Sequence, residues 1–156
     1  MEIKLLEVAG VIPAYKALHL PYGKGISSDR DKDNMLINKL INAGPEHAKI
    51  MRGVMYWLEI NAPIYWWREM ETYRIGRERL SCESTMHIDC KGLSGEKLQK
   101  VKAEITMGKE QRAIDMYSAQ CLRNIYNQRK HHRLPEWHIF CKFIERLPYA
   151  KEFIIC

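Results

Sequence analysis

The sequence of 156 residues lacks the patterns that mark several large classes of protein. It contains no run of about 18 apolar residues, so no segment is expected to span a membrane. The first ten residues, MEIKLLEVAG, include three charged side chains and do not form a signal-peptide pattern, so we expect a cytoplasmic protein. The five cysteines are odd in number and form no CxxC pair, which argues against the disulfide framework of a secreted domain.

The common nucleotide and catalytic motifs are also missing. There is no GxGxxG fingerprint, no P-loop and no GxSxG elbow. The adjacent histidines His131 and His132, and the trio of Cys82, His87 and Cys90, do not have a recognised metal-ligand spacing. We therefore predict no metal site.

The charge of the chain is positive and unevenly spread. Its formal net charge is +6, with 46% hydrophobic and 28% charged residues, which is enough apolar material for an ordinary core. The segment 123–133, RNIYNQRKHHR, holds four arginines and lysines and no acid. A basic block of this kind favours an anionic partner, such as a nucleotide or a nucleic acid.

Two stretches have the pattern of β-strands. Residues 1–8 alternate loosely around a short apolar run, which predicts a first strand. Apolar side chains recur at every second position in 52–60, so this stretch is predicted to lie in a sheet. Asn61 is then a candidate N-cap and Pro63 suits a first helical turn, which predicts a helix that begins within two residues of Pro63 and runs to about residue 74.

The intervening segments read as loops and one helix. Residues 19–34 are rich in Gly, Pro, Ser and Asp and are predicted to form a loop. Asn34 is a candidate cap for a helix that ends at Gly44, and 77–95 shows no clear period and is predicted to form a loop with one short element.

The C-terminal half is predicted to be mainly helical. Apolar residues at helical spacing predict helices over 95–130, and a last helix is expected to begin at Leu134-Pro135. These elements predict one domain, 1–156, of the α/β or α+β class, with a mixed sheet and its longest helices in the C-terminal half.

The segment 65–76, YWWREMETYRIG, carries the aromatic candidates for a binding site. Trp66 and Trp67 point about 100° apart on a helix, so both cannot face one core. One of them, together with Tyr73, could form a platform on which a base or flavin ring stacks. The alternative is that one tryptophan is in the core and the other in a subunit interface.

Polar candidates follow on both sides of Gly76. Arg74 could leave the helix end and bind a phosphate, or it could pair with Glu71 on the surface. Hydroxyls and one carboxylate gather in SCEST, and they could read a base edge or hold a ribose, although a helix cap is the simpler interpretation. The residues of this group are Ser81, Glu83, Ser84 and Thr85.

The order of these pieces resembles the flavin-dependent thymidylate synthases. That family has an EH pair before a strand, then a helix, then a signature of the form RHRxxSxNExSxRY, and later an LR pair. Here Glu46-His47 precedes the strand, and the RHR triplet falls on residues 72–74. The Asn-Glu of the signature falls on Cys82 and Glu83, and Leu122-Arg123 matches the LR pair. The resemblance covers about 34–87 and 118–146.

The resemblance implies a flavin and deoxyuridylate site between the subunits of a tetramer, with Arg129 as the substrate arginine. The signature is degraded, because Thr72 and Tyr73 stand where the family has Arg and His, and His87-Ile88 replaces the final Arg-Tyr. Losing preorganised donors in an active site costs about 10²–10³ in rate for each donor. The chain is therefore expected to bind a nucleotide without turning it over, and to bind no cofactor.

We expect Arg74, Arg123 and Arg129 to converge on one phosphate, since arginine binds phosphate through two parallel hydrogen bonds. The first hypothesis is a homotetrameric, non-catalytic protein that captures a phosphorylated or cyclic nucleotide at a subunit interface, for example as a sponge for an antiviral immune signal. Two alternatives remain open. One is an active, divergent synthase that binds FAD and methylates dUMP, and the other is a nucleic-acid-binding module that uses the block 123–133.

Overall fold

Alternating apolar side chains build the sheet at the centre of the molecule. In strand β2, Met55–Pro63, the buried residues Tyr56, Leu58 and Ile60 alternate with half-buried ones, so one face of the strand points into the core. Strand β4, Glu110–Ser118, buries every second residue in the same way and pairs with β2 along its whole length. The computed structural model describes all residues from Met1 to Cys156.

The sheet has four strands in the order β1-β2-β4-β3, and every pairing is antiparallel. The outer strands are β1, Glu2–Ala9, and β3, Arg77–Cys82. A mixed sheet was expected, but no two neighbouring strands run parallel here. Residues paired across antiparallel strands share a face, so the alternation in β2 and β4 gives the sheet one core face and one open face.

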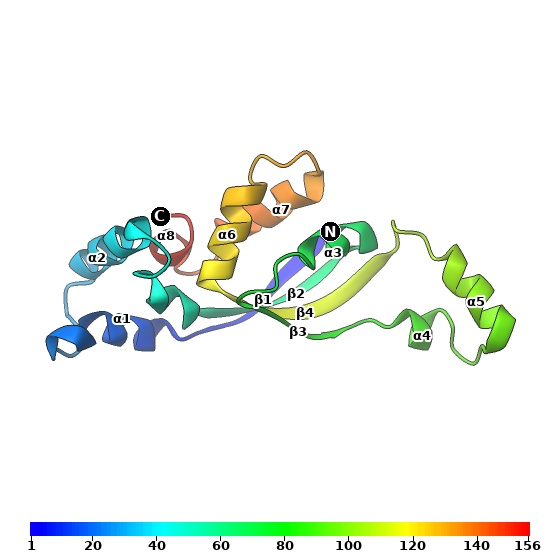
Figure 1. Ribbon diagram of the computed structural model, residues 1–156, viewed down its shortest axis with the longest axis horizontal. Helices are drawn as coiled ribbons and strands as arrows, with labels where there is room; N and C mark the ends of the chain where they lie inside the picture. The colour runs from blue at the N-terminus through cyan, green and yellow to red at the C-terminus, as the bar shows by residue number, and fades with distance from the viewer.

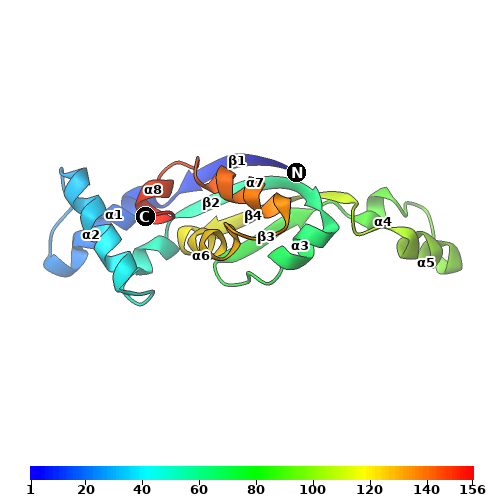
Figure 2. The ribbon, with the colours of Figure 1, turned by 90° about the horizontal axis from the view of Figure 1, so that it is seen from above.

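Three helices pack on the core face, and the opposite face of the sheet has no helix on it (Figures 1 and 2). They are α3, Ile64–Met70, α6, Ala119–Arg129, and α7, Pro135–Ile144. Their buried side chains, among them Trp66, Leu122 and Trp137, join the sheet residues in one apolar cluster. The half-buried Trp57, Ile114 and Met116 lie on the open face.

The remaining elements lie beyond the two ends of the sheet (Figure 1). At one end are α1, Val11–His19, the 3-10 turn η1, Leu20–Tyr22, α2, Arg30–Ala43, the 3-10 turn η2, Lys49–Arg52, and α8, Ala150–Phe153. At the other end, residues 83–109 form an arm that carries α4, Thr85–Ile88, and α5, Gly95–Glu104. Neither arm helix buries a residue, so the arm contributes little to the core.

Several predicted elements are confirmed. The first strand is present, residues 55–60 of the predicted 52–60 lie in the sheet, and the helix after Pro63 begins at Ile64. That helix ends at Met70, short of the predicted residue 74, and Arg52 lies in η2. The last predicted helix is α7. Asn61 does not cap the helix, because β2 continues through it to Pro63.

Other predictions are wrong. Helices were predicted over 95–130, but strand β4 lies between α5 and α6, and its alternation is hidden because one of its buried residues is the charged Asp115. Strand β3 was predicted to be a loop, since its polar side chains conceal the alternation. Helix α2 begins at Arg30 because Asp29, not Asn34, caps it, and at 14 residues it is longer than any helix of the C-terminal half.

Candidate functional site

The two adjacent tryptophans belong to the core and do not form an open platform. Trp66 has no exposed surface and packs against Trp137 and Phe140, with ring centroids 5.0 and 5.5 Å away. Trp67 is 3% exposed, and its indole Nε1 donates to the carbonyl of Gln111 at 2.9 Å. Contrary to the prediction, neither indole ring is open for stacking on a ligand ring in the single chain.

A buried cluster of charges lies beside Trp67 and was missed by the sequence analysis. Asp115, with no exposed surface, accepts from Arg77 Nε at 2.6 Å and from Arg79 Nε at 2.9 Å. The Arg79 guanidinium also stacks on the Trp67 ring, 4.3 Å from its centroid. The exposed Glu71 completes the charge balance through Arg79 Nη1 at 3.0 Å.

Every charge in the cluster is paired with an opposite charge, which indicates a structural role. Burial raises the pKa of the Tyr117 hydroxyl well above its ordinary value, and Asp115, which accepts from it at 3.1 Å, adds to the effect. Burial acts against the charge of Arg77, but Tyr117 and Asp115 outweigh it and raise the Arg77 pKa. Two arginines and two carboxylates leave no unpaired charge for a ligand. The only feature of the sequence that could have indicated this cluster is Asp115, a carboxylate at an inward position of β4.

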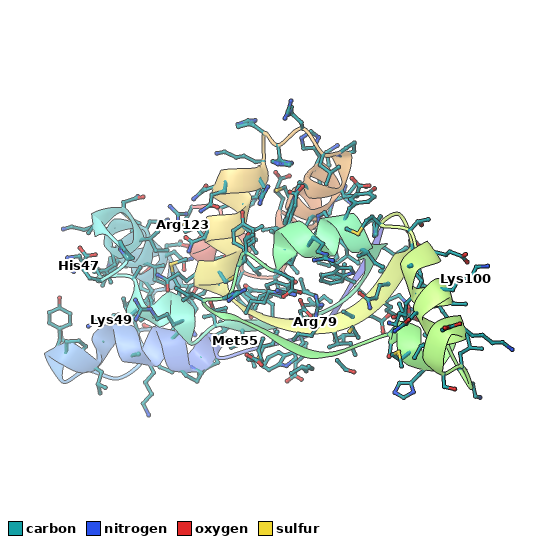
Figure 3. All side chains as sticks on the ribbon, turned by 45° about the vertical axis from the view of Figure 1, so that its right-hand side comes forward. His47, Lys49, Met55, Arg79, Lys100 and Arg123 are labelled. Atoms are coloured by element: carbon teal, nitrogen blue, oxygen red, sulfur yellow. The ribbon has the colours of Figure 1, made fainter.

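The three arginines predicted to converge on a phosphate have different partners. Arg129 Nη1 donates to Glu69 at 2.9 Å, and its guanidinium lies 4.6 Å from the centroid of Trp137. Arg123 Nη1 donates to the carbonyl of Ile154 at 3.0 Å, so it holds the C-terminal segment against α6 (Figure 3). Arg74 forms no salt bridge and makes only a long contact, 3.5 Å, to a backbone carbonyl.

Tyr73 acts with Arg129 rather than facing an open pocket. Its hydroxyl accepts from Arg129 Nε at 2.8 Å and donates to Gln128 at 3.0 Å, and its ring packs edge-on against Trp137. The neighbouring Thr72 Oγ1 donates to the carbonyl of Glu69 at 2.8 Å. Both side chains thus fasten the end of α3.

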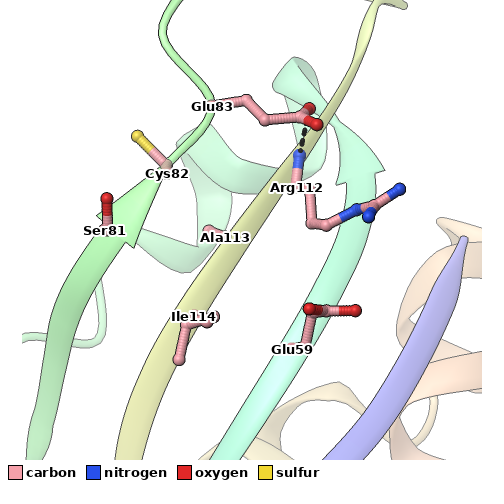
Figure 4. A pocket seen from close by; sticks show the side chains of 7 residues that line it. All are labelled: Glu59, Ser81, Cys82, Glu83, Arg112, Ala113 and Ile114. Carbon is pink, nitrogen blue, oxygen red and sulfur yellow. Dashed lines mark hydrogen bonds between the residues drawn. The ribbon is translucent and has the colours of Figure 1, made fainter.

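Two of the predicted polar residues line a shallow pocket on the sheet (Figure 4). Ser81 and Glu83 lie there beside Arg112, whose backbone N–H donates to Glu83 Oε2 at 3.0 Å. The pocket measures about 170 Å³. Ser84 and Thr85 lie apart from it at the start of α4, where Thr85 Oγ1 accepts from Lys102.

A larger pocket lies where β2, β4, α6 and the turn before β3 meet, and we call it the Arg52 pocket. It measures about 330 Å³. Arg52 Nε donates to Gln120 Oε1 at 3.0 Å, and the arginine forms no salt bridge. The pocket is lined by Arg52, Met55, Ile75, Gly76, Ser118 and Gln120.

The backbone around this pocket is tightly built. Gly76 has φ +77, and a Cβ on it would lie 2.4 Å from Ser118 Oγ, so only glycine fits there. Ser118 Oγ caps α6 by accepting from the N–H of Cys121 at 3.1 Å. The positive end of the α6 dipole therefore borders the pocket, and with Arg52 it favours an anionic group. Arg52 and Gln120 were not predicted from the sequence, whereas Gly76, which lines the same pocket, was identified as a turn after Arg74.

The structure also tests for a metal site and for a membrane span. No group of three histidines, cysteines or carboxylates is arranged to hold a metal ion, so His131, His132, Cys82, His87 and Cys90 form no such cluster. None of the helices is long and apolar enough to cross a bilayer.

The sequence itself matches no family model and no curated protein. The structure is similar to a flavin-dependent thymidylate synthase, ThyX, from Helicobacter pylori complexed with FAD and dUMP, with a TM-score of 0.80 at 16% identity over 100% of this chain and 99% of that one. A second structure of that enzyme, also with FAD and dUMP, has a TM-score of 0.80 and 16% identity over 99% and 97% of the two chains.

A third similar structure is the UMP/dUMP methylase PolB from Streptomyces cacaoi bound to 5-Br dUMP. Its TM-score is 0.72 at 12% identity, over 92% of this chain and 88% of that one. The resemblance predicted from the order of the sequence motifs is thus confirmed at the level of the fold. The chain has the α/β fold of the flavin-dependent thymidylate synthases.

Proposed function

We propose that this protein binds a phosphorylated nucleotide of the dUMP class in the Arg52 pocket. The proposal rests on three groups that meet in one pocket. They are an arginine without a carboxylate partner, the amide of Gln120 and the positive end of α6. The arginine and the helix end favour a phosphate, and the amide can donate to and accept from a base edge. The similar structures that hold dUMP or its bromo analogue support the choice of ligand class.

The residues present do not fit the flavin that the fold family implies. Where that family has Arg and His, this chain has Thr72 and Tyr73, and both side chains are bound to groups of the chain itself. The pocket volume of about 330 Å³ is at the lower end of the range for ligand sites, roughly 300–1,000 Å³. A mononucleotide suits this space better than a flavin dinucleotide, so we propose binding without turnover.

The assembly we propose is a homotetramer in which the nucleotide lies at a subunit interface. It is supported by the open face of the sheet, where Trp57, Ile114 and Met116 are only half-buried in the single chain. A binder of this kind could act as a sponge for an antiviral nucleotide signal. Light scattering that gives an 18.4 kDa monomer at micromolar concentration would contradict the tetramer.

The decisive test is a calorimetric titration of the purified protein with dUMP. Arg52→Ala should weaken binding about 10- to 150-fold, since it removes a charge-assisted hydrogen bond worth about 1.5–3 kcal/mol. The matched control is Arg68→Ala, because Arg68 is an exposed arginine outside the pocket. Equal affinity in the parent and in Arg52→Ala would show that this pocket is not the site.

Two other outcomes would point to the alternative functions. Stoichiometric flavin in the purified protein, together with formation of dTMP from dUMP, would favour an active synthase. Oligonucleotide binding that falls steeply with salt would favour a nucleic-acid-binding module.

A further inference from the structure

A second pocket lies between strand β1 and the outer side of helix α7, and we call it the β1–α7 groove. It measures about 280 Å³ and shares no residue with the Arg52 pocket. Its lining combines three apolar side chains with two cations. The lining residues are Ile3, Ile139, Lys142, Phe143 and Arg146.

The cations of the groove have no acidic partner within the chain. Lys142 and Arg146 are exposed, lie four residues apart on one side of the α7 segment, and form no salt bridge. Two carboxylates of the same segment face other groups: Glu136 accepts from the Tyr65 hydroxyl and Glu145 from the Tyr126 hydroxyl at 2.8 Å. The groove therefore offers uncompensated positive charge.

The floor of the groove is apolar. Ile139 is 45% exposed, although it is a large aliphatic side chain on a helix, and Ile3 and Phe143 are half-buried. Aliphatic side chains from a partner could cover this surface and gain burial. The lining offers a single, half-buried aromatic ring, which is a poor platform for the stacked bases of a nucleic acid.

Strand β1 supplies the third element. It pairs only with β2, so its outer edge presents backbone N–H and C=O groups that no other strand uses. Register shifts only between Leu5 and Glu7, and the residues before Leu5 pair regularly with β2. Ile3 is in this regular part, next to the groove. An extended peptide placed there could pair with β1 while its side chains enter the groove.

We propose that the β1–α7 groove binds an extended segment of a partner protein that adds as a strand to the edge of β1. The segment carries aliphatic and acidic side chains on the same face, so that the aliphatic ones cover Ile139 and Phe143 and a carboxylate reaches Lys142 or Arg146. Backbone pairing provides affinity in this mode of recognition, and the alternate side chains provide specificity. The proposal does not depend on nucleotide binding in the Arg52 pocket.

The probe is a fluorescein-labelled peptide, Thr-Ile-Thr-Glu-Thr-Ile-Thr-Glu, titrated with the full-length protein by fluorescence anisotropy. Its Ile and Glu residues share one face when the peptide is extended. Lys142→Glu combined with Arg146→Glu should weaken binding about tenfold or more, because it converts attraction to repulsion. The matched control is Lys97→Glu combined with Lys100→Glu on the exposed helix α5, which changes the charge equally and should leave affinity within about threefold.

A second variant tests the apolar contribution. Ile139→Ser should weaken the peptide severalfold without unfolding the protein, since the side chain is already 45% exposed. A peptide with Lys in place of Glu should bind at least about tenfold more weakly than the acidic peptide.

Three results would overturn the proposal. They are no saturation by the acidic peptide at millimolar protein, equal binding of the lysine peptide, and equal loss of affinity in the α5 control. Tighter binding of oligothymidylate than of the peptide, abolished by the Lys142 and Arg146 changes, would overturn it too and would assign the surface to nucleic acid.

Discussion

The arginines near the start of β3 and the arginine in the Arg52 pocket lie in contrasting environments. At the start of β3, Arg77 and Arg79 surround the buried carboxylate of Asp115. In the pocket beside the start of α6, Arg52 is bonded to a neutral amide and has no carboxylate. The first group holds the sheet to α3, whereas the second is available to an anion. The residues next to each arginine in the sequence do not reveal whether the fold gives it an acidic partner, so the two environments could not be told apart before the structure was known.

Substitutions in the buried cluster should change the free energy of unfolding more than any other substitution considered below. Arg77→Met would leave Asp115 buried with only part of its compensation, which should lower the free energy of unfolding by about 3–5 kcal/mol. Urea unfolding followed by tryptophan fluorescence measures the change. A double variant, Arg77→Met with Asp115→Leu, should recover most of the loss, because it removes both buried charges.

If Arg77→Met unfolds at the same urea concentration as the parent, the cluster is not compensating a buried charge. Arg52→Ala is the matched control from the other environment. It should change the free energy of unfolding by no more than about 0.5 kcal/mol, since Arg52 is exposed.

Arg129 and Arg74 were both predicted to bind phosphate, but only Arg129 has a carboxylate partner. Replacing them should therefore change the free energy of unfolding by different amounts. Arg129→Ala should lower the free energy of unfolding by about 1.5–3 kcal/mol, because Glu69 and Trp137 lose a charged partner. Arg74→Ala should cost less than about 0.5 kcal/mol. Calorimetric titration with dUMP on both variants then tests whether either arginine also contacts the ligand. Equal stability losses in the two variants would contradict the assignment of Arg129 to the fold.

The smallest expected effect concerns Cys121, which lies between the two environments. Burial raises the pKa of its thiol to about 11 from an ordinary value of 9.0, although the charge of Arg77 lowers it somewhat. The folded protein therefore holds this proton more tightly than the unfolded chain. Its contribution to stability is complete well below pH 9, begins to fall as the pH approaches 9 and is lost as the pH rises to about 11.

Raising the pH from 7 to 9 should cost about 0.4 kcal/mol through this thiol alone. Urea unfolding at the two pH values in reducing buffer measures the cost, and Cys121→Ala should show a smaller decrease. An identical decrease in the variant would mean that Cys121 is not the titrating group.

The parts of the fold that could be predicted from sequence are those in which burial alone sets the pattern. Strand β2 alternates apolar residues on the core face, and Pro63 marks the start of the next helix, so both were predicted. Strand β4 could not be recognised, because its core face includes the charged Asp115. That residue is tolerated inside only because Arg77 and Arg79 reach it from another strand, and such a contact is not visible in the local sequence.

The candidate site was predictable only in outline. The turn that carries Arg74 and Gly76 was identified, and it borders the pocket. Arg52 and Gln120 come from segments far apart in the chain, and each looks like an ordinary surface residue in its own segment. Conversely, Arg123 and Arg129 look like ligand residues in a basic block, but the fold gives them partners in the C-terminal segment and α3.

The arm formed by residues 83–109 has a consequence for the way the molecule opens. Of its residues only Cys90 is buried, and its two helices bury none, so few apolar contacts oppose its local unfolding. Amide hydrogens of α5 are then expected to exchange with solvent through sub-global openings whose free energy is well below that of the sheet. The protein would thus behave as two cooperative units. The sheet with α6 and α7 exchanges slowly, whereas the arm unfolds and refolds many times before the sheet unfolds once.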